Sequence, residues 1–155
     1  MFDLLILDID GVMTSGGKYY DNDAAVIMKK YNDRDFTAIK RFKMECIKVC
    51  FLSGDARVNE SMAKARNIDF YLSKTWVEGS NKEEFIPKFV KTYDVKPPQM
   101  AYVGDDFYDI GIMNKVGYAY CPSNSPRCVK DISTVLDVKA GDGVVARLYD
   151  LVFHD

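Results

Sequence analysis

The chain has 155 residues, of which 48% are apolar and 28% are charged, and its formal net charge is −2. This length suits one domain with a complete hydrophobic core, so we expect a single domain over residues 1–155. The small negative charge gives no electrostatic basis for binding nucleic acid or an anionic membrane surface.

Sequence patterns for targeting and for zinc are missing as well. No apolar run reaches the roughly 18 residues of a membrane helix, and no signal-peptide pattern precedes the first strand. We therefore expect a cytoplasmic protein without membrane contact. The four cysteines lack C-x-x-C spacing and the only histidine is His154, which argues against a zinc site or a disulfide framework and favours reduced, mostly buried thiols.

The first predicted element is a buried strand that ends in two acids. Leu4 to Leu7 are apolar, and Asp8 and Asp10 follow, with Gly11 next. Ligands of open α/β sheets bind outside the carboxyl ends of the strands. Two carboxylates in one small site repel each other unless a cation or a shared proton intervenes, and such oxygen ligands suit Mg²⁺. An isolated D-x-D pair is equally typical of a plain strand end.

Residues 16–31 favour a β-hairpin directly after this acidic loop, because two β-rich segments flank Asn22 to Ala25. Its position would let it act as a flap over the loop. Isolated two-stranded hairpins are marginal in water, so we expect this one to pack on the core or on another subunit.

Alternating strand and helix patterns in the rest of the chain predict a parallel sheet with helices on both faces. Asp35 is expected to cap the first helix, and the next strand ends in Ser53 and Gly54. The expected elements are a helix to about residue 44, strands 47–52, 68–72, 100–103 and 118–120, helices 57–67 and about 82–93, a brief helix from Ser125, and a last helix after Gly143. Asp105, Asp106 and Asp109 follow strand 100–103.

These strand ends and Lys82 would meet at one edge of the sheet. There, an aspartate can attack phosphorus and form an acyl phosphate. A second carboxylate can protonate the leaving oxygen and later activate water. A third helps to hold Mg²⁺, and a lysine and a serine hydroxyl stabilise charge on the phosphoryl oxygens. The ordered set therefore predicts phosphoryl transfer.

Four ordered motifs resemble those of the haloacid dehalogenase superfamily of phosphotransferases. They are Asp8-Ile9-Asp10-Gly11-Val12, Ser53-Gly54, Lys82 and Gly104-Asp105-Asp106-x-x-Asp109. The resemblance implies a Rossmann-like three-layer α/β sandwich with a central parallel sheet. It implies Asp8 as nucleophile, Asp10 as acid/base, and Ser53, Gly54 and Lys82 on the phosphate. It also implies Mg²⁺ on the side chains of Asp8 and Asp105 and on the backbone carbonyl of Asp10, with Asp109 positioning Lys82 or the metal waters and Asp106 assisting.

The chain has room only for the hairpin where most of the superfamily carries a cap domain. Short, capless members of this kind are the 3-deoxy-D-manno-octulosonate 8-phosphate phosphatases, which residues 17–22, 32–35 and 141–145 resemble. The resemblance implies a Mg²⁺-dependent phosphoric monoester hydrolase that acts on a keto-deoxy sugar acid phosphate. It also implies a homotetramer, built in part by the hairpins, in which neighbouring subunits complete each active site.

Departures from that family's pattern leave the substrate open. Phe36-Thr37-Ala38 replaces a segment with two glycines, so we expect a reshaped pocket. Asp55 stands where the family has an arginine, and Arg147 is displaced by one position. The candidates for binding the sugar carboxylate are therefore Arg34, Arg57 and Arg147, because arginine offers a bidentate fork. A longer segment over residues 74–78 makes Lys74 a fallback for Lys82 and contains Trp76, expected as a loop anchor.

Two alternatives remain beside the octulosonate phosphatase, and a third is excluded. Relatives with altered pockets hydrolyse nonulosonate 9-phosphates, the sialic-acid-like sugars. A degenerate, non-catalytic tetramerisation module of the same fold is compatible with the changed glycines, although the intact acids oppose it. A receiver-like signalling domain fails on motif order, because receivers carry their phosphate-accepting aspartate on a middle strand, whereas here Asp8 follows the first one.

Overall fold

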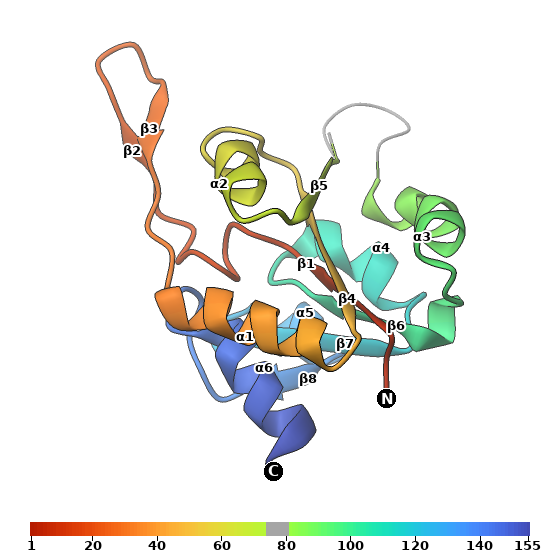
Figure 1. Cartoon of the computed structure of the whole chain (residues 1–155). Coiled ribbons are helices and arrows are strands. Elements are labelled where there is room, and N and C mark those ends of the chain that lie inside the picture. Colours follow the sequence, from red (N-terminus) through yellow and green to blue (C-terminus); the bar gives the residue numbers. More distant parts are fainter. Residues whose placement is uncertain (74–80) are drawn as a thin grey trace.

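Six parallel strands form the centre of the structure, a computed structural model that describes residues 1–73 and 81–155 (Figure 1). Their order across the sheet is β5-β4-β1-β6-β7-β8. The strands are β1 (Leu4–Leu7), β4 (Lys48–Ser53), β5 (Asp69–Leu72), β6 (Met100–Val103), β7 (Tyr118–Pro122) and β8 (Thr134–Leu136). Strand β1 pairs with β4 and β6 and is buried at every residue, as a central strand covered on both faces must be.

Helices cover both faces of this sheet, which confirms the predicted three-layer sandwich. The α-helices are α1 (Asp33–Met44), α2 (Asn59–Ala65), α3 (Ile86–Tyr93), α4 (Ile110–Met113), α5 (Arg127–Lys130) and α6 (Val144–Phe153), and the 3-10 helices are η1 (Lys82–Phe85), η2 (Pro97–Gln99) and η3 (Phe107–Asp109). One core lies between the sheet and α1, α2 and α6, and a second lies between the sheet and α3, α4 and α5. Within the described residues, no helix has the length and apolar character needed to cross a membrane.

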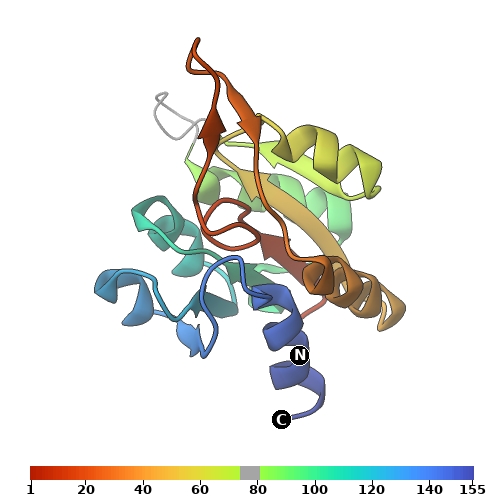
Figure 2. The same ribbon diagram turned by 90° about the vertical axis from the view of Figure 1, so that its left-hand side faces the viewer.

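The hairpin projects away from the sheet (Figures 1 and 2). Its strands are β2 (Tyr19–Tyr20) and β3 (Val26–Met28), paired antiparallel, so its predicted place in the chain is confirmed. Its apolar side chains do not pack on the core of their own subunit. Tyr19, Tyr20, Ile27 and Met28 are each more than half exposed. Lys29, one residue after β3, is the next buried residue along the chain.

Several sequence-based expectations about packing were wrong. Phe36 and Ala38 are buried in the core on the inner face of α1, and neither lines the cavity that contains Asp8 and Asp10. Strand β8 was not predicted, because it has three residues of which two are exposed. Among the cysteines, Cys50 and Cys121 are buried but Cys46 is exposed.

Asp35 caps a different helix from the one expected. Asn32 is the N-cap of α1, and its side chain accepts the Arg34 N–H at 3.0 Å. The Oδ1 atom of Asp35, fully buried, instead accepts the N–H groups of Val145 (2.9 Å) and Ala146 (3.0 Å) in the first turn of α6. Its other oxygen, Oδ2, has no hydrogen-bond partner among the described residues. Asp35 therefore joins α1 to α6 across 110 residues of sequence.

This cap predicts a pH-dependent stability. Burial raises the pKa of Asp35 to about 6, although the two N–H donors act to lower it. Because the folded value lies above the unfolded value of about 3.9, the Asp35 contribution to the free energy of unfolding falls as the pH rises from about 4 to 6. Asp35→Asn keeps one acceptor oxygen without the charge, so it should flatten this dependence and be more stable at pH 7 by up to about 3 kcal/mol.

Urea denaturation between pH 4.5 and 7.5 measures the effect, with Asp33→Asn as the control because Asp33 is exposed on the same turn. If Asp35→Asn and wild type keep the same difference in unfolding free energy at every pH, the assignment of this titration to Asp35 is wrong.

Candidate active site

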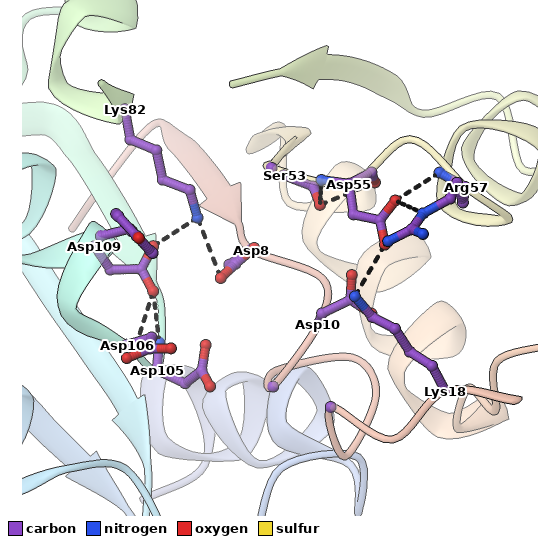
Figure 3. A pocket seen from close by; sticks show the side chains of 14 residues that line it. Asp8, Asp10, Lys18, Ser53, Asp55, Arg57, Lys82, Asp105, Asp106 and Asp109 are labelled. Atoms are coloured by element: carbon purple, nitrogen blue, oxygen red, sulfur yellow. Dashed lines mark hydrogen bonds and ion pairs between the residues drawn. The ribbon is translucent and has the colours of Figure 1, made fainter. Parts of the chain in front are cut away.

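The carboxyl edge of the sheet carries a cavity of about 330 Å³ (Figure 3). The loops after β1, β4 and β6, the start of η1 and the segment before the hairpin line it. The predicted catalytic, phosphate-binding and metal-binding residues all line this cavity, apart from Arg34; they are Asp8, Asp10, Ser53, Gly54, Lys82, Asp105, Asp106 and Asp109. Motifs separated by up to 100 residues thus meet at the edge where the strand pattern predicted them.

Asp8 is held in a buried position at the end of β1. Its Oδ1 accepts the Ile9 N–H at 2.8 Å, and its Oδ2 lies 3.2 Å from the Nζ atom of Lys82. Burial raises the pKa of Asp8 well above its usual range, while the Lys82 ammonium acts to lower it. Gly11 lets the β1 loop approach the loop after β6, because its φ is +84° and a Cβ there would lie 1.9 Å from an oxygen of Asp105.

Lys82 is a buried ammonium held by Asp109. Its Nζ lies 2.7 Å from Asp109 Oδ1 and 3.0 Å from the hydroxyl of Tyr102, which donates to the same Oδ1. Burial would lower the pKa of Lys82, but the carboxylates of Asp109 and Asp8 raise it, so the group stays charged. The Oδ2 atom of Asp109 accepts the N–H groups of Asp105 (2.8 Å) and Asp106 (3.0 Å). Asp109 therefore fixes both Lys82 and the loop after β6.

Carboxylate oxygens of Asp8, Asp105 and Asp109 lie within 4.8 Å of one another and could hold a divalent cation. Both oxygens of Asp109 are already engaged, which leaves Asp8 and Asp105 as the side-chain ligands. Burial, followed by the charges of Asp109 and Asp106, raises the pKa of Asp105 to about 7. Crowded, partly desolvated carboxylates of this kind fit Mg²⁺, which prefers oxygen ligands. Asp106 is exposed and accepts the Phe107 N–H at 2.7 Å, so it caps η3.

Asp10 is fixed by two residues that the sequence did not single out. Its Oδ2 accepts hydrogen bonds from Lys29 Nζ and from Asn59 Nδ2, each at 2.9 Å, and its Oδ1 accepts one from Thr14 Oγ1 at 3.3 Å. The side chain of Lys29 is completely buried and also reaches Asp55 Oδ2 at 3.0 Å. A lysine beside another lysine after a hairpin strand usually indicates a solvated surface, so no local signal marked it.

The second motif forms a turn around Ser53 and Asp55. Ser53 is buried, and its Oγ lies 3.2 Å from both the N and the O atoms of Asp55. The Asp55 carboxylate is held by Arg57 through two nitrogens (2.8 and 3.1 Å), by Lys18 (3.1 Å) and by Lys29. Partial burial would raise the pKa of Asp55, but these cations hold it well below its usual range. The fork of Arg57 is therefore occupied by a carboxylate of its own chain.

Of the three arginines predicted to bind the sugar carboxylate, one lines the cavity. Arg57 lines it. Arg34 does not, because it is exposed on the first turn of α1 and lines a separate groove between α1 and α6. Arg147 pairs with Asp137 and Asp155 on the surface. Lys74, predicted as a fallback for Lys82, and Trp76, predicted as a loop anchor, lie outside the described residues.

Comparisons with known proteins agree with this geometry. A family profile described as haloacid dehalogenase-like hydrolase matches residues 59–148. The 3-deoxy-D-manno-octulosonate 8-phosphate phosphatase of Yersinia pestis is 30% identical over 151 residues, which cover 96% of this chain and 78% of that protein. The chain belongs to the haloacid dehalogenase-like hydrolases, in the family of these phosphatases.

Solved structures of relatives have the same fold as this hydrolase. The cobalt-bound form of the deoxy-D-mannose-octulosonate 8-phosphate phosphatase from Haemophilus influenzae superposes with a TM-score of 0.89 at 28% identity, covering 97% of this chain and 86% of that one. The enzyme from Moraxella catarrhalis, in complex with a magnesium ion, a phosphate ion and a KDO molecule, superposes with a TM-score of 0.86 at 19% identity, covering 97% and 85%. At that identity the second match shows the fold alone.

The crowded carboxylates predict that cation binding depends on pH. A metal competes with protons for its ligands, so the affinity for Mg²⁺ should rise as the pH passes upward through about 7, the pKa of Asp105 without metal. Isothermal titration calorimetry at pH 6, 7 and 8 measures this. Asp105→Asn should weaken binding at least about tenfold, whereas Asp106→Asn, which alters an exposed neighbour, should leave it within about twofold. Equal losses in the two variants would contradict the assignment of Asp105 as a ligand.

Proposed function

We propose that this hydrolase is a Mg²⁺-dependent phosphatase that works through an aspartyl phosphate on Asp8. One observation carries the proposal: a buried carboxylate at the end of the central strand lies beside a buried ammonium, in a cavity that also contains Asp10. A nucleophilic aspartate needs a cation beside it, because otherwise it would repel the phosphate dianion. Membership of the phosphatase family supports the same reaction.

Each residue then has a defined task. An Oδ atom of Asp8 attacks phosphorus, the bond from phosphorus to the ester oxygen breaks, and that oxygen takes a proton from Asp10. Asp10 next removes a proton from water, which attacks phosphorus and releases phosphate while Asp8 is restored. Lys82 and Ser53 stabilise charge on the phosphoryl oxygens, and the backbone of Gly54 lines the same cavity.

The side chains of Asp8 and Asp105 and the backbone carbonyl of Asp10 would hold Mg²⁺. Bound there, Mg²⁺ neutralises charge so that a carboxylate and a phosphate can approach each other. Asp109 keeps Lys82 and the loop of Asp105 in place, as its four hydrogen bonds indicate. The cobalt-bound structure of the relative from Haemophilus influenzae supports a metal-dependent reaction.

Release of phosphate from sugar phosphates and from p-nitrophenyl phosphate, with Mg²⁺ and with a chelator, tests the proposal. Asp8→Asn should abolish turnover with the fold retained, because the amide has a similar volume and is not a nucleophile. The variant should still unfold at a temperature close to or above that of wild type, since it removes a buried charge. Substantial turnover by Asp8→Asn would rule out Asp8 as the nucleophile, and a wild-type protein inert toward all esters would rule out the phosphatase.

We further propose a keto-deoxy sugar acid phosphate as the substrate, of the 3-deoxy-D-manno-octulosonate 8-phosphate type. The name of the Yersinia pestis relative supports the octulosonate ester. Two cations that line the cavity, Lys18 and Arg57, support an additional anionic group there. A nonulosonate 9-phosphate remains the second candidate, since Asp55 changes the position that the family fills with arginine.

A comparison of kcat/KM for octulosonate 8-phosphate, nonulosonate 9-phosphates and hexose phosphates resolves the substrate. Asp55→Asn should lower KM for the sugar acid esters about three- to tenfold, because it removes a competing carboxylate and releases the fork of Arg57. The KM of a neutral hexose phosphate should change less. If all esters respond alike to Asp55→Asn, Arg57 does not bind the sugar carboxylate.

We also propose that the chain assembles as a homotetramer through the hairpin. The four exposed apolar side chains of β2 and β3 support this, because a two-stranded hairpin that does not pack on its own core needs another surface. Light scattering coupled to gel filtration measures the mass in solution. Tyr20→Glu should shift the protein toward smaller species, and a wild-type monomer would disprove the assembly. A non-catalytic tetramerisation module is less well supported, because it gives the buried Asp8–Lys82 pair no task.

A further inference from the structure

We infer that Lys29 is a positioning residue for Asp10. This inference rests on the proposed phosphatase function, and it concerns a residue that lies outside the four motifs. Lys29 follows strand β3 of the hairpin, yet its side chain is completely buried. Its Nζ atom lies 2.9 Å from Asp10 Oδ2 and 3.0 Å from Asp55 Oδ2, so one ammonium joins two carboxylates from the loops after β1 and β4.

The hydrogen bonds around Asp10 decide which of its oxygens can carry a proton. Oδ2 accepts from Lys29 and from Asn59, and both of these groups are donors there. A proton on Oδ2 would point at one of these donors, so it belongs on Oδ1. The only partner of Oδ1 among the described side chains is the hydroxyl of Thr14 at 3.3 Å, which can accept as well as donate. Lys29 and Asn59 thus keep Oδ1 as the acidic oxygen of Asp10.

Lys29 also prevents two carboxylates from repelling each other. Asp10 and Asp55 each place an oxygen within 3.0 Å of its Nζ, so without the ammonium these oxygens would face each other in a partly buried site. The Asp10 side chain would then move or rotate away from Asp55. Asn59 anchors the other end of this arrangement, because it is fully buried and accepts the Tyr31 hydroxyl at 2.6 Å.

The dependence of rate on the leaving group tests this role. A general acid matters most for a poor leaving group, so loss of Asp10 alignment should slow phenyl phosphate far more than p-nitrophenyl phosphate. Because kcat/KM reports formation of the aspartyl phosphate, the step in which the leaving group departs, we expect kcat/KM in Lys29→Met to fall about tenfold to a hundredfold on phenyl phosphate and less than about threefold on p-nitrophenyl phosphate. A merely structural role would lower both by the same factor.

Lys18→Met is the matched control. Lys18 directly precedes strand β2 of the hairpin and pairs with the same Oδ2 of Asp55, at 3.1 Å, and Asp10 is not among its partners in the described residues. Its loss removes the same charge, so KM can rise for both esters, but the ratio of kcat/KM on the two esters should stay as in wild type. The same change of this ratio in both variants would overturn the assignment of Lys29, as would equal losses of kcat/KM on the two esters in Lys29→Met.

A second variant covers the case in which Lys29→Met does not fold. Lys29→Met combined with Asp55→Asn removes one of the two facing carboxylates, so it should regain stability relative to Lys29→Met. Its ratio of kcat/KM on phenyl phosphate to that on p-nitrophenyl phosphate should remain low relative to that of Asp55→Asn, and a ratio restored to the Asp55→Asn value would show that Lys29 acts only on stability. If the wild-type protein is inert toward both esters, the proposed function is wrong and so is this assignment. If wild type is active and Lys29→Met leaves the ratio between the two esters unchanged, only this assignment is wrong.

Discussion

Repulsion among carboxylates at one edge of the sheet is the constraint on which the rest of this structure depends. The loops after strands β1, β4 and β6 each carry acids, and the parallel arrangement of the strands brings these acids into one cavity. Two buried ammonium groups separate them: Lys82 lies between Asp8 and Asp109, and Lys29 lies between Asp10 and Asp55. Burying an unpaired charge is expensive, so the acids and these lysines have to be placed together.

The position of one of these lysines could be predicted from the sequence, whereas that of the other could not. Lys82 opens a helical segment in the right order behind two strand ends, and this order predicted its place beside Asp8. Lys29 directly follows a hairpin strand whose apolar residues are mostly exposed, and its neighbour Lys30 is exposed as well. Its environment depends on where the loops after β1 and β4 come together, which is a property of the tertiary structure.

The strands and helix caps likewise fall into those that could be predicted from the sequence and those that could not. Central strands such as β1 and β6 are apolar throughout and could be predicted, because both of their faces are covered. Strand β8 could not, because it is short and largely exposed at the edge of the sheet. Aspartate is a residue type that often caps helix N-termini, so the sequence predicts that Asp35 caps α1. Its hydrogen-bond partners instead lie 110 and 111 residues away, and they come close only because α6 packs on α1.

The hairpin would link the proposed assembly to the proposed active site. Its outer part presents apolar side chains to solvent, whereas its base delivers Lys29 to Asp10 and Asp55 and Tyr31 to Asn59. Moving the base of the hairpin therefore means breaking buried, charge-assisted hydrogen bonds, which are stronger than neutral ones. A second subunit that covers the outer part would restrict the same segment. The position of Asp10 would then depend on contacts that lie outside the cavity.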